Sequence, residues 1–177
     1  MRPGYSAIHR AVSDLGLGPT AWFVNGAGVL NCLLLTAWVV AFFRRARERL
    51  PKPWPWVAAP LLALPPLGYA VASIFTEAPA TLAVHSMVGA NLGLFFPVAV
   101  FFVAGLALRR NPDWRGWSAY SFIASVATLI LVGITLWAFS PGSMISALRL
   151  EGLLERLVIY ETLAWYAYSG WRIARDA

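Results

Sequence analysis

Charged residues and cysteine are both scarce in this chain. Asp, Glu, Lys and Arg make up only 12% of its 177 residues, and Cys32 is the single cysteine. One cysteine excludes an intrachain disulfide and argues against a cysteine-based metal site. The sequence also lacks Walker, Rossmann, haem and zinc-protease signatures, which removes the common cofactor-dependent enzyme classes. We therefore expect neither a cofactor nor a metal site.

Long apolar runs dominate the sequence instead. Hydrophobic residues make up 59% of the chain, and the mean hydropathy is +0.65. About 20 helical residues, rising ~1.5 Å each, cross the hydrocarbon core of a bilayer. Five runs have that length: residues 20–43, 54–75, 85–108, 117–139 and 152–171. This pattern predicts an all-α, polytopic transmembrane helical bundle with five spans, forming a single integral membrane domain over residues 1–177.

Prolines and small residues indicate how these runs pack. Prolines within the second and third runs predict kinks or breaks there: Pro60, Pro65, Pro66 and Pro97. Gly89 and Gly93 form a small-xxx-small pair, which lets helix backbones approach closely. Packing within the bundle is the favoured interpretation over dimerisation, and the sequence leaves the oligomeric state open.

Positive charge alternates between the connectors. The chain has 14 Lys and Arg residues against 8 Asp and Glu, a net charge of +6. The basic residues gather in 44–53, 109–116 and the C-terminal tail, whereas the connector 76–84 has none. Because basic loops stay in the cytoplasm, we predict a multi-pass cell-membrane protein with its N-terminus outside and its C-terminus cytoplasmic. Membrane topology explains this clustering better than a nucleic-acid partner does.

The N-terminal segment raises a difficulty for this topology. Residues 1–19 would have to cross the membrane with no signal sequence ahead of them. Short tails can be translocated, but an additional helix before Met1 is the simpler explanation. We therefore expect the chain to lack the first of six helices.

Several short motifs are spread over the whole chain. They are Arg2-Pro3-Gly4-Tyr5-Ser6, Ser13-Asp14-Leu15-Gly16, Ile74-Phe75, His85 at the start of a run, and Arg109-Arg110-Asn111-Pro112-Asp113-Trp114-Arg115. Together they resemble the "domain of unknown function 998" family of polytopic membrane proteins. The resemblance implies six helices, the first preceding the block at Arg2, and no established activity. The Ser-Asp-Leu-Gly element is more distantly similar to the FRAG/DRAM/Sfk group. The family's Pro-x-Asp after Ile74-Phe75 is replaced here by Thr76-Glu77-Ala78.

Polar residues inside the spans mark the candidate site, because lipid penalises them. Glu161 is the clearest case. It lies roughly 15 Å below the outer end of the last run, so it must be protonated or meet a donor from another helix. With the other polar groups it predicts a polar cavity that opens to the outer half of the bundle. The candidate ligand-binding residues are Asp14, Asn25, His85, Asn91, Glu155 and Glu161.

Three functions fit such a cavity. We favour a protein that binds, moves or senses a lipid or a small amphipathic molecule, with membrane lipids as partners. The second is a membrane-embedded lipid hydrolase or transferase that uses His85 with Asp14 and Ser13. The third is a structural or partner-binding bundle, in which these groups make interhelical hydrogen bonds of about 0.6–2 kcal/mol each. Whether the protein is an enzyme stays open at this point.

Overall fold

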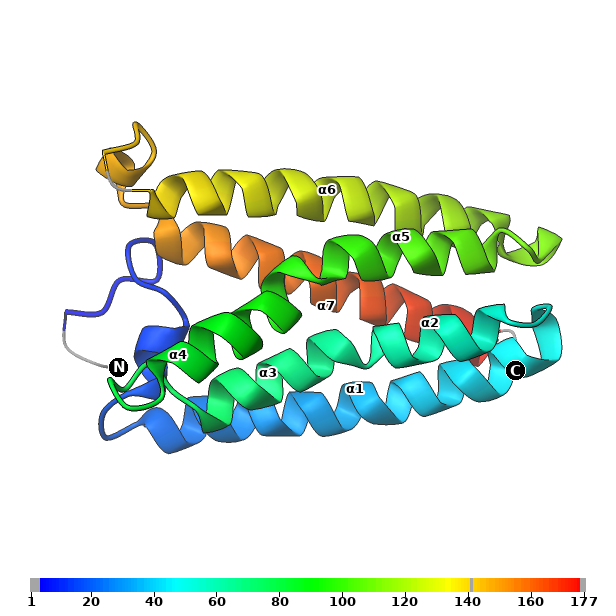
Figure 1. Cartoon of the computed structure of the whole chain (residues 1–177), viewed down its shortest axis with the longest axis horizontal. Helices are drawn as coiled ribbons and strands as arrows, with labels where there is room; N and C mark the ends of the chain where they lie inside the picture. The colour runs from blue at the N-terminus through cyan, green and yellow to red at the C-terminus, as the bar shows by residue number, and fades with distance from the viewer. Residues whose placement is uncertain (1–3, 141, 176–177) are drawn as a thin grey trace.

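Five helical segments run side by side along one axis in the computed structural model, which describes residues 4–140 and 142–175 (Figure 1). The segments are α1 (Ala21–Arg49); α2 (Trp54–Leu62) followed by α3 (Leu64–Ile74); α4 (Leu82–Val84), η2 (His85–Phe95) and α5 (Pro97–Leu108); α6 (Arg115–Phe139); and α7 (Glu151–Arg175). Three short 3₁₀ helices lie outside them: η1 (Ser13–Gly16), η3 (Pro112–Trp114) and η4 (Ser146–Leu148). The described residues contain no strand, so the predicted all-α class is confirmed.

The connectors alternate between the two ends of the bundle (Figure 1). The segment before α1, the connector between α3 and α4, and the connector between α6 and α7 lie at one end. The connectors 50–53 and 109–114 lie at the other end, together with the C-terminal end of α7. The chain therefore runs along the long axis five times, once in each predicted apolar run.

Prolines shape the second and third passes. Pro60 lacks an amide hydrogen, and α2 ends two residues later. Pro65 and Pro66 stand in the first turn of α3, where a missing N–H leaves no helical bond unmade. Pro97 begins α5 in the same way. The segment before it, η2, is π-helical, and the Phe96 N–H donates to the Asn91 carbonyl oxygen at 2.9 Å.

Within the residues that the structure describes, four segments are long and apolar enough to span a membrane: Ala21–Arg49, Trp54–Ile74, Leu82–Leu108 and Pro112–Phe139. The fifth pass, α7, is 25 residues long and lies alongside α6 (Figure 1). It contains Glu155, Arg156 and Glu161, which lower its average apolarity. The protein is thus a multi-pass membrane protein, and the fifth span stays a prediction.

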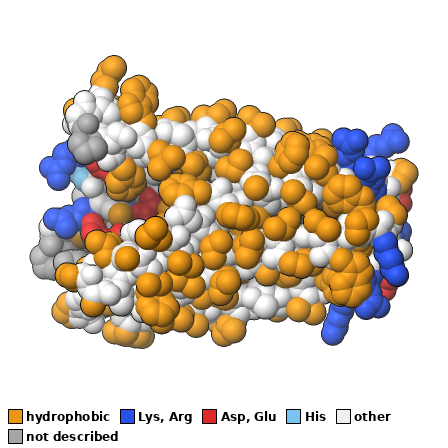
Figure 2. All heavy atoms as spheres, in the orientation of Figure 1, with side chains coloured by type: hydrophobic (Ala, Val, Ile, Leu, Met, Phe, Trp, Pro, Cys, Tyr) orange, Lys and Arg blue, Asp and Glu red, His pale blue; other side chains and the backbone are white. Residues whose placement is uncertain are grey.

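The surface has the charge distribution of a membrane protein. Figure 2 shows hydrophobic side chains over the middle of the bundle and most Lys and Arg side chains at one end. Leu33, Ile123 and Leu129 are among the large apolar residues that are more than half exposed. In water these side chains would be unfavourable, whereas lipid solvates them. The end with connectors 50–53 and 109–114 is called the basic end below, and the other the opposite end.

Aromatic side chains fill the half of the bundle next to the basic end. Trp165 is fully buried and stacks on Phe101, with ring centroids 4.6 Å apart. Its Nε1–H donates to Ser121 Oγ at 3.0 Å. Trp117 is also fully buried, and its Nε1–H donates to Ser169 Oγ at 2.9 Å. Both indoles therefore have the partner that a buried N–H needs. The other half of the bundle holds a cavity.

Candidate functional site

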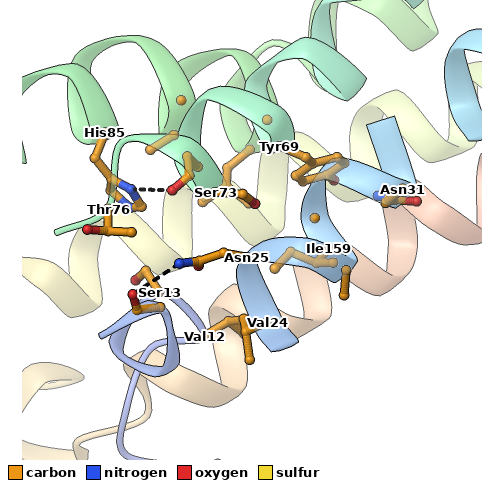
Figure 3. Close-up of a pocket in the computed structure, with 18 of the residues that line it drawn as sticks. Val12, Ser13, Val24, Asn25, Asn31, Tyr69, Ser73, Thr76, His85 and Ile159 are labelled. Atoms are coloured by element: carbon orange, nitrogen blue, oxygen red, sulfur yellow. Dashed lines mark hydrogen bonds between the residues drawn. The ribbon is translucent and has the colours of Figure 1, made fainter. Parts of the chain in front are cut away.

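The cavity lies near the opposite end and has a volume of about 330 Å³. It is enclosed by η1 and the residue before it, by α1, α3 and η2, and by α7 (Figure 3). Its lining residues are Val12, Ser13, Gly16, Val24, Asn25, Ala27, Gly28, Asn31, Tyr69, Ala72, Ser73, Thr76, His85, Gly89, Ala90, Gly93, Leu94, Glu155, Ile159 and Leu163. Figure 2 shows acidic side chains around a recess at this end of the molecule.

Small residues keep the cavity open and set its walls. The backbones of α3 and η2 touch: a Cβ on Gly68 would lie 2.3 Å from the Gly93 nitrogen, and one on Gly89 would lie 2.8 Å from the Ala72 nitrogen. The predicted role of Gly89 and Gly93 in packing within the bundle agrees with these contacts. A Cβ on Gly28 of α1 would likewise overlap a neighbour, in this case the Ser73 side chain. Larger residues at these positions would either separate the helices or fill the cavity.

His85 is held by the end of α3. Its Nδ1 lies 3.0 Å from the Ala72 carbonyl oxygen and 2.9 Å from the Phe75 carbonyl oxygen. Two carbonyl oxygens can only accept, so Nδ1 carries the hydrogen and donates to both. The remaining nitrogen, Nε2, lies 3.6 Å from Glu77 Oε1. The imidazole is buried and thereby ties the start of η2 to the end of α3.

Glu155 is tied to the N-terminal segment, which folds over α7. Its carboxylate accepts a hydrogen bond of 2.6 Å from the Val12 backbone N–H. The neighbouring Arg156 donates to the Ala7 carbonyl oxygen at 2.7 Å and to the Tyr5 hydroxyl. A Cβ on Gly152 would lie only 2.0 Å from the Arg10 carbonyl oxygen, so the N-terminal segment packs directly against the backbone of α7 at this glycine. Segment 5–16 therefore covers one side of the cavity.

Three predicted site residues line the cavity: Asn25, His85 and Glu155. The Asn25 side-chain N–H donates to the Gly16 carbonyl oxygen at 3.2 Å and so holds η1 against α1. Asp14 lies on η1 between the lining residues Ser13 and Gly16, without being among the lining residues itself.

Asn91 does not point into the bundle, and that prediction is wrong. It is exposed, and its side-chain N–H groups donate to the Ser86 and Met87 carbonyl oxygens at 3.1 and 3.0 Å. The cause is local. In the π-helical η2, backbone hydrogen bonds join residues five positions apart, not four as in an α-helix. The Asn91 amide finds acceptors on its own helix there and needs none from another helix.

Glu161 also lies outside the cavity lining, contrary to the prediction of one shared cavity. Thr128 of α6 supplies the donor that a carboxyl at this depth requires, with 2.5 Å between Thr128 Oγ1 and Glu161 Oε2. Glu155 and Glu161 are six residues apart on α7, which at ~100° per residue turns them to different faces. The structure therefore separates the two glutamates, one in the cavity and one between α6 and α7.

Polar side chains on α3 and just after its end contribute to the cavity and were not predicted from the sequence. Tyr69, Ser73 and Thr76 line the cavity and follow one another at intervals of four and three residues. Such spacing places side chains on one face of a helix. A search for polar residues at helical spacing in the apolar run 54–75 and the residue after it would have found them.

The hydrolase hypothesis finds little support in this geometry. No hydrogen bond joins Ser13 to His85 within the described parts of the chain, although both line the cavity. A nucleophile and its base need to be within hydrogen-bond reach in a plausible substrate complex. The His85 Nδ1–H is engaged with backbone carbonyls instead of a carboxylate. Among residues 4–140 and 142–175, no group of three or more His, Cys, Asp or Glu side chains could hold a metal ion.

The fold and the surface define an all-α, multi-pass membrane protein with one mixed polar and apolar cavity near one end. The family described as "Protein of unknown function (DUF998)" matches residues 1–172, and the chain belongs to this family. Neither the curated proteins nor the solved structures contain a match.

Proposed function

We propose that this protein binds a small amphipathic molecule, such as a lipid or a lipid fragment, in the cavity near the opposite end. The observation that carries the proposal is a lining that combines polar groups at one end with apolar side chains along the cavity. Ser13, Asn25, His85 and Glu155 gather where η1 and α7 meet the end of α3, while Leu94 and Leu163 lie farther along η2 and α7. A polar head and an apolar tail would each find a matching environment.

The polar part of the cavity is rich in hydrogen-bond acceptors. The Glu155 carboxylate, which lines the cavity, has only acceptors. The Asn25 side-chain N–H donates to the Gly16 carbonyl oxygen, and the Asn25 amide oxygen is a further acceptor. Arg156 donates to backbone carbonyls of the N-terminal segment. We therefore expect a head group that donates hydrogen bonds, such as an amine or a polyol.

Replacement of Glu155 by Gln tests this proposal. Gln keeps the size of the side chain but removes the charge that a donor head group would meet. We expect the Glu155→Gln variant to retain roughly 10- to 100-fold less of the bound molecule, since a hydrogen bond to a charged group contributes about 1.5–3 kcal/mol. The measurement is mass spectrometry of organic extracts from gently purified protein, compared between variant and wild type.

Glu161→Gln is the matched control for this experiment. It makes the same chemical change on the same helix, but Glu161 lies outside the cavity lining. We expect its extract to match that of the wild type. Equal retention by both variants, or equal loss from both, would contradict ligand binding at Glu155.

We further propose that the basic end faces the cytoplasm and the cavity faces the other side. Labelling of single cysteines in a Cys32→Ser background tests this orientation. Ala80→Cys lies in the connector between α3 and α4, and Arg47→Cys lies at the basic end; both parent residues are exposed. We expect an impermeant maleimide to modify position 80 in intact cells and position 47 only after permeabilisation. The reverse pattern would refute the orientation.

A further inference from the structure

We propose that a groove between α1 and α2 binds an anionic phospholipid, with one acyl chain in the groove and the phosphate at the basic end of the bundle. The site lies away from the cavity described above and does not depend on its function. Two adjoining hollows form it, one of about 310 Å³ and one of about 240 Å³, and both are lined by Trp56.

The larger hollow is an apolar groove that opens on the lipid-facing surface. Val40 and Phe43 of α1 form one wall, and Ala59 and Pro60 of α2 with Ala63, the residue between α2 and α3, form the other. The alanines leave space that larger side chains would fill. Val40 is 46% exposed, so the groove is accessible from the bilayer. Because all its lining side chains are apolar, an acyl chain is a suitable occupant.

The smaller hollow is basic and continues the groove toward the end of the bundle. It is lined by Arg47, Lys52 and Trp56, together with Leu50 and Pro55. Aromatic contacts connect the two hollows. The Phe43 and Trp56 rings pack edge to face with centroids 4.8 Å apart, and the Arg47 guanidinium carbon lies 5.7 Å from the Phe43 ring centroid. A phosphate on Arg47 would therefore sit directly beyond an acyl chain that passes Phe43.

Both cations are available for a ligand. Among residues 4–140 and 142–175 the ion pairs are Arg45 with Glu48, at 3.3 Å, and Glu77 with His85, so neither Arg47 nor Lys52 is paired. Basic pockets between transmembrane helices attract anionic headgroups. A choline headgroup carries its own positive charge, which this pocket would repel.

Charge also favours a lipid over a second copy of this chain. The basic end carries Arg44, Arg45, Arg47, Arg49 and Lys52 at the α1–α2 connector, with Arg109 and Arg110 beyond α5. A dimer formed through this groove would bring two such clusters together, and like charges in contact oppose association. An anionic lipid would instead neutralise the charge of Arg47 and Lys52 in the smaller hollow.

Native mass spectrometry of the detergent-released protein tests the site. The probes are phosphatidylglycerol and phosphatidylcholine with the same acyl chains. We expect the wild type to retain one phosphatidylglycerol in preference to phosphatidylcholine. Removal of both cations in Arg47→Ala/Lys52→Ala should weaken this retention roughly 10- to 30-fold, because each basic residue contributes to binding of an anionic headgroup. Inorganic phosphate in excess should not displace the lipid, because it cannot occupy the groove.

Two further variants separate the parts of the site. Ala63→Leu fills the groove without a change of charge and should weaken phosphatidylglycerol retention as well. Arg109→Ala/Arg115→Ala removes the same charge from the basic end outside the hollow and should bind as the wild type does. Thermal stability measured on each variant shows whether it is folded. The proposal would be overturned by equal retention of both lipids, by full displacement with phosphate, by loss of binding in the control pair, or by a dimer that Ala63→Leu dissociates without any lipid preference.

Discussion

Gly68→Ala is expected to destabilise the protein strongly. The backbones of α3 and η2 are in contact at this position, and a Cβ on Gly68 would lie 2.3 Å from the Gly93 nitrogen and 2.7 Å from the Leu92 carbonyl carbon. Both are backbone atoms, so the overlap can be relieved only if one helix moves away from the other. Overpacking in a dense interior costs about 1–3 kcal/mol and occasionally more, and this contact belongs at the upper end of that range. The same movement would displace the cavity wall formed by Tyr69 and Gly93.

The measurement is the fraction of protein that stays folded after heating in detergent, determined by size-exclusion chromatography. Gly133→Ala is the matched control, because it makes the same change in α6, where a Cβ would have no atom within 4 Å. Alanine favours helix by up to about 1 kcal/mol over glycine, so the control should be unchanged or slightly more stable. A Gly68→Ala variant as stable as Gly133→Ala would show that α3 and η2 do not pack as described.

Trp165→Ala is expected to destabilise the protein by roughly 3 kcal/mol, the lower end of the range for a large aromatic residue removed from a core. The lower end applies because lipid removes much of the hydrophobic driving force, while the packing loss remains. Trp165 is fully buried, stacks on Phe101 and contacts Trp38 edge to face at 5.7 Å. Its removal would leave a void that these two rings cannot fill without moving.

Two variants make this result specific. Trp165→Phe keeps a ring but removes the indole N–H that donates to Ser121, and we expect it to lose about 1 kcal/mol. Trp22→Ala removes an indole that is 75% exposed, and we expect almost no change in stability. Thermal unfolding in the same detergent orders the variants. Equal loss from Trp22→Ala and Trp165→Ala would contradict the aromatic core.

About half of the candidate site could be predicted from the sequence. Asn25, His85 and Glu155 were recognisable because polar groups at the ends of apolar runs need partners, and the connectors place the ends of those runs together. Asn91 and Glu161 are also polar groups that need partners, but neither lines the cavity. Asn91 is satisfied on its own helix, and Glu161 is satisfied by Thr128. The need for a partner was correctly predicted for Glu161, whereas its location was not.

The membrane environment, the helical class and the alternation of connectors between two ends all follow from the amino-acid sequence alone. These properties depend on the length and apolarity of each run and on the position of basic residues, all of which are local. Which polar residues share the cavity, in contrast, is set by the packing of the helices. The shared residues depend on how each helix is rotated about its axis. Neighbouring residues of a helix point in directions ~100° apart, so a shift of one position changes which side chain faces the cavity. The π-helical segment η2 and the backbone contact between Gly68 and Gly93 set the rotation of α3 and η2 against each other. The contact joins two different apolar runs, which no periodicity within a single run records.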